Sequence, residues 1–127
     1  EIQSSRKNIC ESYSSLQISE QYERSSNLVS QVAHMFFLQF NTDLGSKEFI
    51  SKMKDLGVSV ATHYEPLHAS TFGRKYPSEA GGFPNSKNTA KKLVRIPVWV
   101  DLGQKNLEKI IESCVESFQH IQNLEKK

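Results

Sequence analysis

The sequence predicts an α+β domain, close to a βαβ arrangement, in which helices cover a small sheet of about three strands. Three patterns carry this prediction. The region 107–121 places apolar side chains at helical spacing, the aromatic run 34–40 is typical of a central strand covered on both faces, and residues 58–64 alternate as a strand does. The helical stripe consists of Leu107, Ile110, Ile111, Cys114, Phe118 and Ile121.

The chain opens with a predicted helix that leads into a polar connector. In the first 16 residues, apolar and aromatic side chains recur at helical spacing. Residues 19–30 are rich in Ser, Gln and Glu and show no period, which predicts a surface loop. The helical positions are Ile2, Ile9, Tyr13 and Leu16. Because the chain begins at Glu1 within this helix, we expect it to be part of a longer protein.

A second helix is predicted after the aromatic strand. Ser46 is the expected N-cap, and Gly57 lies where a left-handed C-terminal cap is favoured. Its apolar stripe consists of Phe49, Ile50, Met53 and Leu56. The alternating strand that follows is expected to place Val58, Val60, Thr62 and Tyr64 on one face and Ser59, Ala61 and His63 on the other. His63 should therefore point away from the valines.

A long irregular segment separates this strand from the last elements. Pro66 ends the strand because it cannot donate to a ladder, and residues 66–84 contain glycines and prolines without a period. Loops near twenty residues are generally disordered or part of a binding site. A short helix is predicted next, capped by Asn85 or Ser86, and then a strand over 96–100, in which Pro97 favours an edge or irregular pairing. The apolar positions of that short helix are Ala90, Leu93 and Val94.

Length and charge restrict the classes of protein. We expect residues 1–127 to form one domain, with a helix and connector over 1–30 and an α/β body over 31–127. Sixteen Lys and Arg against fourteen Asp and Glu leave a net charge of +2. Because the two signs are interleaved along the chain, a nucleic-acid partner is not indicated.

Neither a membrane segment nor a cysteine-based site is indicated. The apolar run at 35–38 is far shorter than the roughly 20 residues of a membrane helix, and no charged-then-apolar leader opens the chain. A soluble, cytoplasmic protein is expected. Cys10 and Cys114 lie far apart in helical regions without a C-x-x-C pair, so we expect both to be reduced.

The densest cluster of functional side chains is His63-Tyr64-Glu65-Pro66-Leu67-His68, at the end of a strand, where side chains can project into a cleft. Four interpretations are open. Zinc would find at most three ligands here, and a histidine acting as general base with Glu65 to orient it has weak support. A purely structural alternative has His63 and Tyr64 partly buried with backbone partners, and His68 in solvent. The fourth is substrate contact by His63, Tyr64 and His68.

Other candidates carry less chemistry. His34 is expected to be structural and His120 solvent-exposed. The motifs G-x-x-x-x-G-K-[ST], G-x-G-x-x-G, G-x-S-x-G and H-E-x-x-H do not occur. The basic pairs Arg74-Lys75 and Lys91-Lys92 could meet a phosphate, although a solvated face is favoured at this density.

Three motifs are similar to those of a known family. They are Ala33-His34-Met35-Phe36-Phe37, the cluster from His63 to His68, and Arg95-Ile96-Pro97-Val98. In this order and spacing they resemble the carboxy-terminal end of the DegT/StrS sugar aminotransferases, in A-H-M-F, in H-Y-x-P-L-H and in an R-[LI]-P strand after a helix. The resemblance covers about 32–121 and looks most like the WecE-type dTDP-4-amino-4,6-dideoxygalactose transaminases.

This resemblance implies the small C-terminal domain of a fold-type-I aminotransferase. Its partners would be the large domain of the same protein, which holds pyridoxal phosphate (PLP), and a second subunit in a homodimer. The implied reaction transfers an amino group, commonly from glutamate, to a dTDP-4-keto-6-deoxy sugar, for lipopolysaccharide, enterobacterial common antigen or another surface polysaccharide. The lysine that holds PLP as an imine would lie in the large domain. We therefore expect no catalytic residue and no cofactor in this chain, which alone should be inactive.

The resemblance also implies a role for the histidine cluster. His63, Tyr64 and His68 match H-Y-x-P-L-H and would contact the nucleotide-sugar substrate, because imidazole and phenol groups suit sugar hydroxyls and a diphosphate. Glu65 occupies a position that is often apolar in the family, and the run 98–100 replaces a leucine and aromatic run. The exact sugar and nucleotide therefore stay open. The rival hypothesis is a stand-alone ligand-binding or interaction domain with the same fold.

Overall fold

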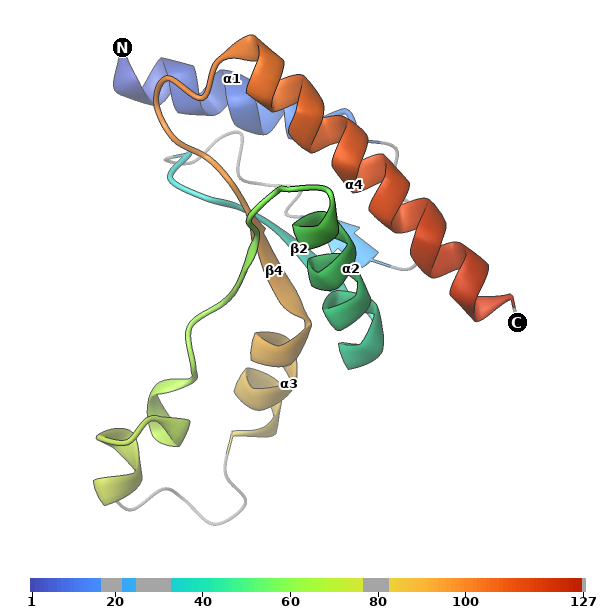
Figure 1. The fold of residues 1–127 in the computed structure, drawn as a ribbon. Helices are drawn as coiled ribbons and strands as arrows, with labels where there is room; N and C mark the ends of the chain where they lie inside the picture. Colours follow the sequence, from blue (N-terminus) through green and yellow to red (C-terminus); the bar gives the residue numbers. More distant parts are fainter. Residues whose placement is uncertain (17–21, 25–32, 77–82, 127) are drawn as a thin grey trace.

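The computed structural model describes residues 1–16, 22–24, 33–76 and 83–126 (Figure 1). The predicted order of helix, strand, helix, strand, loop, helix, strand and helix is confirmed, and the α+β class with it. The elements are α1 (Ile2–Ser14), β1 (Tyr22–Arg24), β2 (Phe36–Phe40), α2 (Asp43–Asp55), β3 (Ala61–Thr62), the short 3₁₀ turns η2 (Leu67–Ala69) and η3 (Gly73–Lys75), α3 (Pro84–Lys92), β4 (Leu93–Ile96) and α4 (Gln104–Glu125).

The sheet is antiparallel throughout, with the strand order β1-β2-β4-β3. β2 lies between two other strands, as its sequence predicts. β1 corrects the prediction of an unstructured connector, since Tyr22 pairs with Phe40 and Arg24 with Leu38. The three residues of β1 are mostly polar and too few to show a period. They form a strand because the edge of β2 offers unpaired backbone groups.

The prediction that β2 is covered on both faces is wrong. Phe36, Leu38 and Phe40 are buried, whereas Phe37 and Gln39 are half-buried. In the register with β4, Phe36 lies opposite Ile96 and Phe37 opposite Arg95. One face of the sheet is therefore apolar and covered, and the other carries mixed side chains.

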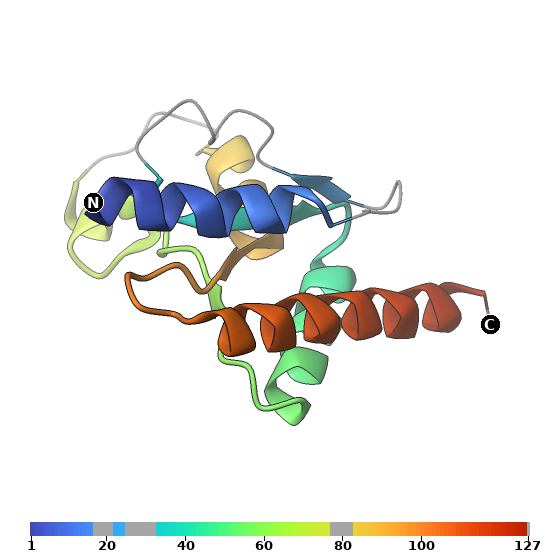
Figure 2. The ribbon, with the colours of Figure 1, turned by 90° about the horizontal axis from the view of Figure 1, so that it is seen from above.

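Helices α1, α2 and α4 contribute to the core on the apolar face of the sheet (Figures 1 and 2). The rings of Phe40, Phe49 and Phe118 join β2, α2 and α4, with centroids 5.1 Å apart for the first pair and 4.9 Å for the last two. Such tilted and stacked aromatic pairs add to the stabilisation from area burial. The apolar stripe predicted for α4 is confirmed as the face that enters this core.

α1 joins the same core through Tyr13, which is fully buried. Its hydroxyl donates a 2.7 Å hydrogen bond to the carbonyl oxygen of Pro97, and its ring lies 5.3 Å from that of Phe36. Cys10 and Cys114 are buried free thiols. Within the described ranges, no helix has the length and apolar character needed to span a membrane.

The beginning of α2 corrects the predicted cap. Thr42, not Ser46, is the N-cap, and its side-chain oxygen accepts a 3.0 Å hydrogen bond from the Gly45 amide. Ser46 is buried, and its hydroxyl lies 2.8 Å from the Lys91 carbonyl oxygen. It therefore ties α2 to the end of α3. Gly57 has the predicted left-handed conformation, with φ 73°.

The boundary between α3 and β4 also differs from the prediction. α3 ends at Lys92, and Leu93 and Val94 belong to the strand instead of the helix. Val94 pairs with Leu38 of β2, so pairing with the sheet outweighs the helical spacing that continues past Lys92. Pro97 follows the strand directly, where its lack of an amide proton costs no ladder bond.

The long irregular segment after β3 is confirmed over its described part. It contains η2 and η3, and residues 77–82 lie outside the described residues. Figure 1 shows this segment and α3 at the end of the molecule away from α1.

Candidate functional site

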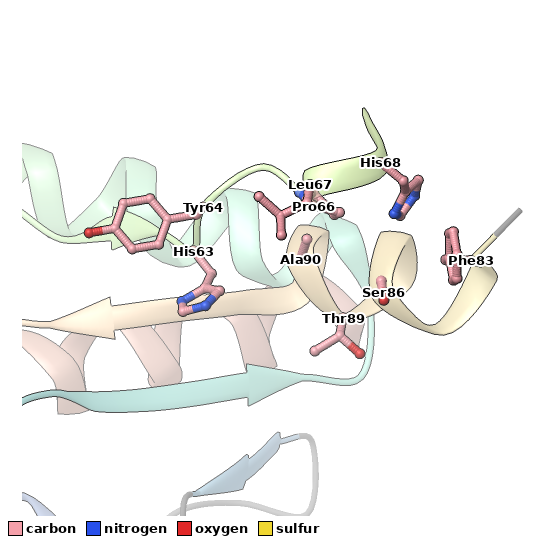
Figure 3. A pocket seen from close by; sticks show the side chains of 9 residues that line it. All are labelled: His63, Tyr64, Pro66, Leu67, His68, Phe83, Ser86, Thr89 and Ala90. Carbon is pink, nitrogen blue, oxygen red and sulfur yellow. The ribbon is translucent and has the colours of Figure 1, made fainter. Parts of the chain in front are cut away.

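The strand end predicted to carry the site lies beside a hollow of about 470 Å³. The end of β3, the 3₁₀ turn η2 and one face of α3 form its walls (Figure 3). His63, Tyr64 and His68, separated by up to five positions in the sequence, all contribute to the lining. The full lining is His63, Tyr64, Pro66, Leu67, His68, Phe83, Ser86, Thr89 and Ala90.

His63 is half-buried at the end of β3. Its backbone amide donates a 3.3 Å hydrogen bond to the Leu93 carbonyl oxygen, which anchors the residue to β4. Its ring lies edge-on to Tyr64 at 5.5 Å. The Nδ1 atom is buried and has no hydrogen-bond partner among the described residues. Such a group is uncommon in folded proteins and calls for a partner.

His68 repeats this situation on η2. Its ring lies 4.8 Å from the ring of Phe83 at the start of α3. Its Nε2 atom is buried and has no hydrogen-bond partner in the described part of the chain. Two imidazoles with an unpartnered buried nitrogen thus line one hollow.

Tyr64 has a different environment, because its side chain is 70% exposed. The guanidinium carbon of Arg95 on β4 lies 4.6 Å from the ring centroid, a distance at which a cation is attracted to an aromatic face. Arg95 Nε is itself buried without a hydrogen-bond partner among the described residues. The contact therefore orients the phenol while leaving its hydroxyl accessible.

The purely structural alternative agrees with His63, which is half-buried with a backbone hydrogen bond to Leu93, but not with Tyr64 and His68. Tyr64 is exposed instead of partly buried, and His68 is half-buried against Phe83 instead of lying in solvent. Glu65, considered as a partner of His63, lies 3.5 Å from Arg74 Nη2. No group of three or more His, Cys, Asp and Glu side chains suited to a metal ion occurs among the described residues.

The two remaining histidines lie outside the hollow. His34 is exposed and precedes β2 in the sequence. His120 is partly exposed, and its Nε2 atom lies 3.7 Å from a carboxylate oxygen of Glu48, so it bridges α4 and α2.

Sequence reasoning missed the wall formed by α3. Ser86, Thr89 and Ala90 lie at spacings of three and four residues and share the helix face that lines the hollow. That spacing was visible in the sequence, but small and polar side chains give no amphipathic signal. Arg95 was visible within the R-I-P motif, and only the fold places its guanidinium against Tyr64.

Exposed apolar side chains occur in the lining of the hollow and at the two ends of η3. Such a concentration usually marks an interaction surface. They are Tyr64, Leu67, Phe72, Tyr76 and Phe83, with exposed fractions between 45% and 87%.

A match to a protein-family model shows which family this chain belongs to. A model of the DegT/DnrJ/EryC1/StrS aminotransferase family matches residues 1–115. This chain belongs to that family. The family resemblance that the three motifs predict is therefore confirmed.

Solved sugar aminotransferases share the fold. The apo-form of the putative sugar aminotransferase Spr1654 from Streptococcus pneumoniae is 17% identical, with a TM-score of 0.83 over 99% of this chain and 33% of that chain. The aminotransferase TlmJ from Streptoalloteichus hindustanus is 15% identical, with a TM-score of 0.81 over 95% of this chain and 33% of its own. The present chain therefore spans about a third of the length of each of these two aminotransferases.

Spr1654 is also known in a PLP-form, 16% identical, with a TM-score of 0.78 over 94% of this chain and 32% of that chain. A lysine that holds PLP as an imine is activated by desolvation or a neighbouring cation. Lys47, Lys87 and Lys91, which line a second hollow together with His63, are all exposed. Lys47 Nζ lies 2.8 Å from an Asp43 carboxylate oxygen. These three lysines do not fit that role.

Proposed function

We propose that this chain is the C-terminal small domain of a PLP-dependent nucleotide-sugar aminotransferase, and that His63, Tyr64 and His68 contact the sugar nucleotide. The observation that carries the proposal is the shared hollow, in which two buried imidazole nitrogens lack hydrogen-bond partners among the described residues. Family membership supports the reaction class, and the H-Y-x-P-L-H motif supports the choice of residues.

The chemistry of the lining suits a deoxy sugar. An imidazole offers one donor and one acceptor, so the rings of His63 and His68 can each bind a sugar hydroxyl or the keto oxygen. Leu67 and Phe83 offer apolar surface to the ring face and to a methyl group. Together, the hydrogen bonds and the apolar contacts would orient the sugar for amino transfer and exclude water from it.

In this proposal the chain supplies binding and orientation, and the catalytic groups lie elsewhere in the protein. PLP, when bound, supplies the electron sink of the reaction. We assign the lysine that holds it to a large domain outside this chain, so the 127-residue chain alone is expected to be inactive. Glutamate is the proposed amino donor, and a dTDP-4-keto-6-deoxy sugar the proposed acceptor.

The wider context rests on the resemblance of the three motifs alone. We place the complete enzyme in the cytoplasm as a homodimer, with the exposed apolar side chains around the hollow covered by the large domain or the second subunit. Its product would serve lipopolysaccharide, enterobacterial common antigen or another surface polysaccharide.

The test uses the complete protein that contains this chain, loaded with PLP. Formation of 2-oxoglutarate from glutamate is measured with a panel of 4-keto-6-deoxy nucleotide sugars. In His63→Ala and His68→Ala we expect KM for the sugar nucleotide to rise roughly tenfold, since one hydrogen bond contributes about 0.5 to 1.5 kcal/mol and an unpaired group costs more. The half-reaction with glutamate, followed by the cofactor absorbance, should keep its rate.

His120→Gln is the matched control, because it removes an imidazole that lies outside the hollow. It should leave both KM values unchanged. The proposal fails if the wild-type protein aminates no sugar nucleotide, or if the His63 and His68 variants slow the glutamate half-reaction as much as the sugar half-reaction.

A further inference from the structure

Arg95 lies on the face of the sheet that is turned away from the core. Its strand, β4, is placed between β2 and β3, so Arg95 has Phe37 on one side and Ala61 on the other. The two neighbours of Arg95 in β4 are buried in the core, and successive side chains of a strand leave opposite faces. Arg95 does not line the hollow of about 470 Å³ that contains the histidines. Its backbone is therefore fixed by strands on both sides, close to the site but outside it.

The charge of Arg95 is not balanced by a salt bridge. Arg95 is half-buried, and its guanidinium forms no ion pair with an Asp or Glu of the described residues. Its Nε atom is buried and has no hydrogen-bond partner in the same part of the chain. Removing a cation from water without a counter-ion is costly. The contact that offsets this cost is the ring of Tyr64, whose centroid lies 4.6 Å from the guanidinium carbon.

The side chain of Tyr64 depends on this contact for its position. It is 70% exposed, and an exposed side chain exchanges readily between rotamers unless a neighbour holds it. The guanidinium of Arg95 lies over the ring, and the ring of His63 lies edge-on to it at 5.5 Å. Figure 3 shows the phenol extending over β4, away from Phe83, with His63 beside it. One cation and one imidazole thus keep an exposed phenol in a single orientation.

We propose that Arg95 is a positioning residue of the site, which holds Tyr64 in place and, through Tyr64, the imidazole of His63. The guanidinium contacts the phenol ring, the phenol ring contacts the imidazole, and the imidazole lies in the wall of the hollow. A planar guanidinium lies flat on a ring, which an ammonium group cannot do. This inference rests on the proposed function and adds to it a residue outside the H-Y-x-P-L-H motif.

The positioning role is tested first by fluorine NMR, with 3-fluorotyrosine incorporated at position 64 of the complete protein. The ¹⁹F resonance reports the surroundings and the mobility of this ring. In Arg95→Gln and Arg95→Lys we expect the resonance to narrow and to move toward its position in the unfolded protein. Arg6→Gln is the matched control and should leave the resonance unchanged. Arg6 is also half-buried, with a buried Nε that lacks a partner among the described residues, but it does not line the hollow.

The effect on the site is measured as KM for the sugar nucleotide. Arg95→Gln should raise KM roughly three- to tenfold, the range that corresponds to a cation over an aromatic ring. Arg95→Lys keeps the charge and should raise KM only about twofold. Tyr64→Ala should raise KM at least as much as Arg95→Gln, and the double variant no more than Tyr64→Ala alone, since Arg95 acts through Tyr64. The half-reaction with glutamate should keep its rate in every variant.

Two results would overturn the inference. The first is a ¹⁹F resonance of Tyr64 that is the same in the wild type and in Arg95→Gln, whether or not the protein aminates a sugar. The second is a double variant in which the effects of Arg95→Gln and Tyr64→Ala on KM multiply, because Arg95 would then act on its own. If Arg95→Gln does not fold, Arg95→Lys takes its place in both measurements. If the wild type aminates no sugar nucleotide, the proposed function fails, and the ¹⁹F resonance still decides whether Arg95 holds Tyr64.

Discussion

The hydrogen bond from Tyr13 to Pro97 offers a sharp test of what holds α1 in place. It joins residues 84 positions apart at 2.7 Å, and the ring of Tyr13 is fully buried against Phe36. In Tyr13→Phe the ring packing is kept and only the donor is removed. The Pro97 carbonyl oxygen loses this hydrogen bond, so we expect the free energy of unfolding to fall by about 1 to 3 kcal/mol.

Urea unfolding of the 127-residue chain measures this loss. Circular dichroism reports the helices, and Trp99, the single tryptophan, reports the segment after β4. Coincident transitions from the two probes establish two-state behaviour. For a chain of this length each kcal/mol corresponds to roughly 3 to 5 °C in the midpoint of thermal unfolding.

The matched control is Tyr76→Phe, because Tyr76 is 61% exposed and its ring lies tilted against that of Phe72, with the centroids 5.2 Å apart. Its effect should stay within about 0.5 kcal/mol. If Tyr13→Phe costs no more than Tyr76→Phe, the buried hydrogen bond contributes no net stability, and α1 must be held by apolar contact alone.

Two further predictions concern pH and the site loop. Burial raises the pKa of Cys114 to about 12 and also raises that of Tyr13. The unfolded chain therefore releases these protons first as pH rises. The free energy of unfolding should decline by up to ~1.4 kcal/mol per pH unit for each group, above about pH 9 for Cys114 and above about pH 10 for Tyr13. Urea titrations between pH 7 and 10.5 check this. The prediction is contradicted if the free energy of unfolding of Cys114→Ala falls with pH as steeply as that of the wild type. A Cβ on Gly73 would overlap the Leu67 carbonyl and approach the His68 Cα, so Gly73→Ala should displace η2. Given the proposed function, this variant should raise KM for the sugar nucleotide several-fold in the complete enzyme. Its unfolding temperature should change little. An unchanged KM would show that η2 does not position the substrate.

The parts of the fold that were predicted correctly are those whose burial shows in the sequence. The stripe from Leu107 to Ile121 faces the core because a helix of this amphipathicity must bury one side. Gly57 ends its helix with φ 73° because glycine adopts this conformation at little cost. The central position of β2 follows from its aromatic residues.

The parts that were predicted incorrectly depend on partners distant in the sequence. Thr42 and Ser46 are both acceptable caps; in the fold Thr42 caps the helix, and Ser46 contacts the Lys91 carbonyl oxygen instead. β1 forms only because β2 presents an edge, and β4 begins at Leu93 because its residues pair with that strand. Local propensity carries no information about such pairings.

The candidate site divides in the same way. Sequence motifs by themselves determined the family and singled out His63, Tyr64 and His68, because a motif of chemically distinctive residues is readable without a fold. Only the tertiary structure brought Phe83 to His68 and Arg95 to Tyr64. The physical reason is that a hollow is a property of surfaces from several elements, whereas a sequence records each element separately.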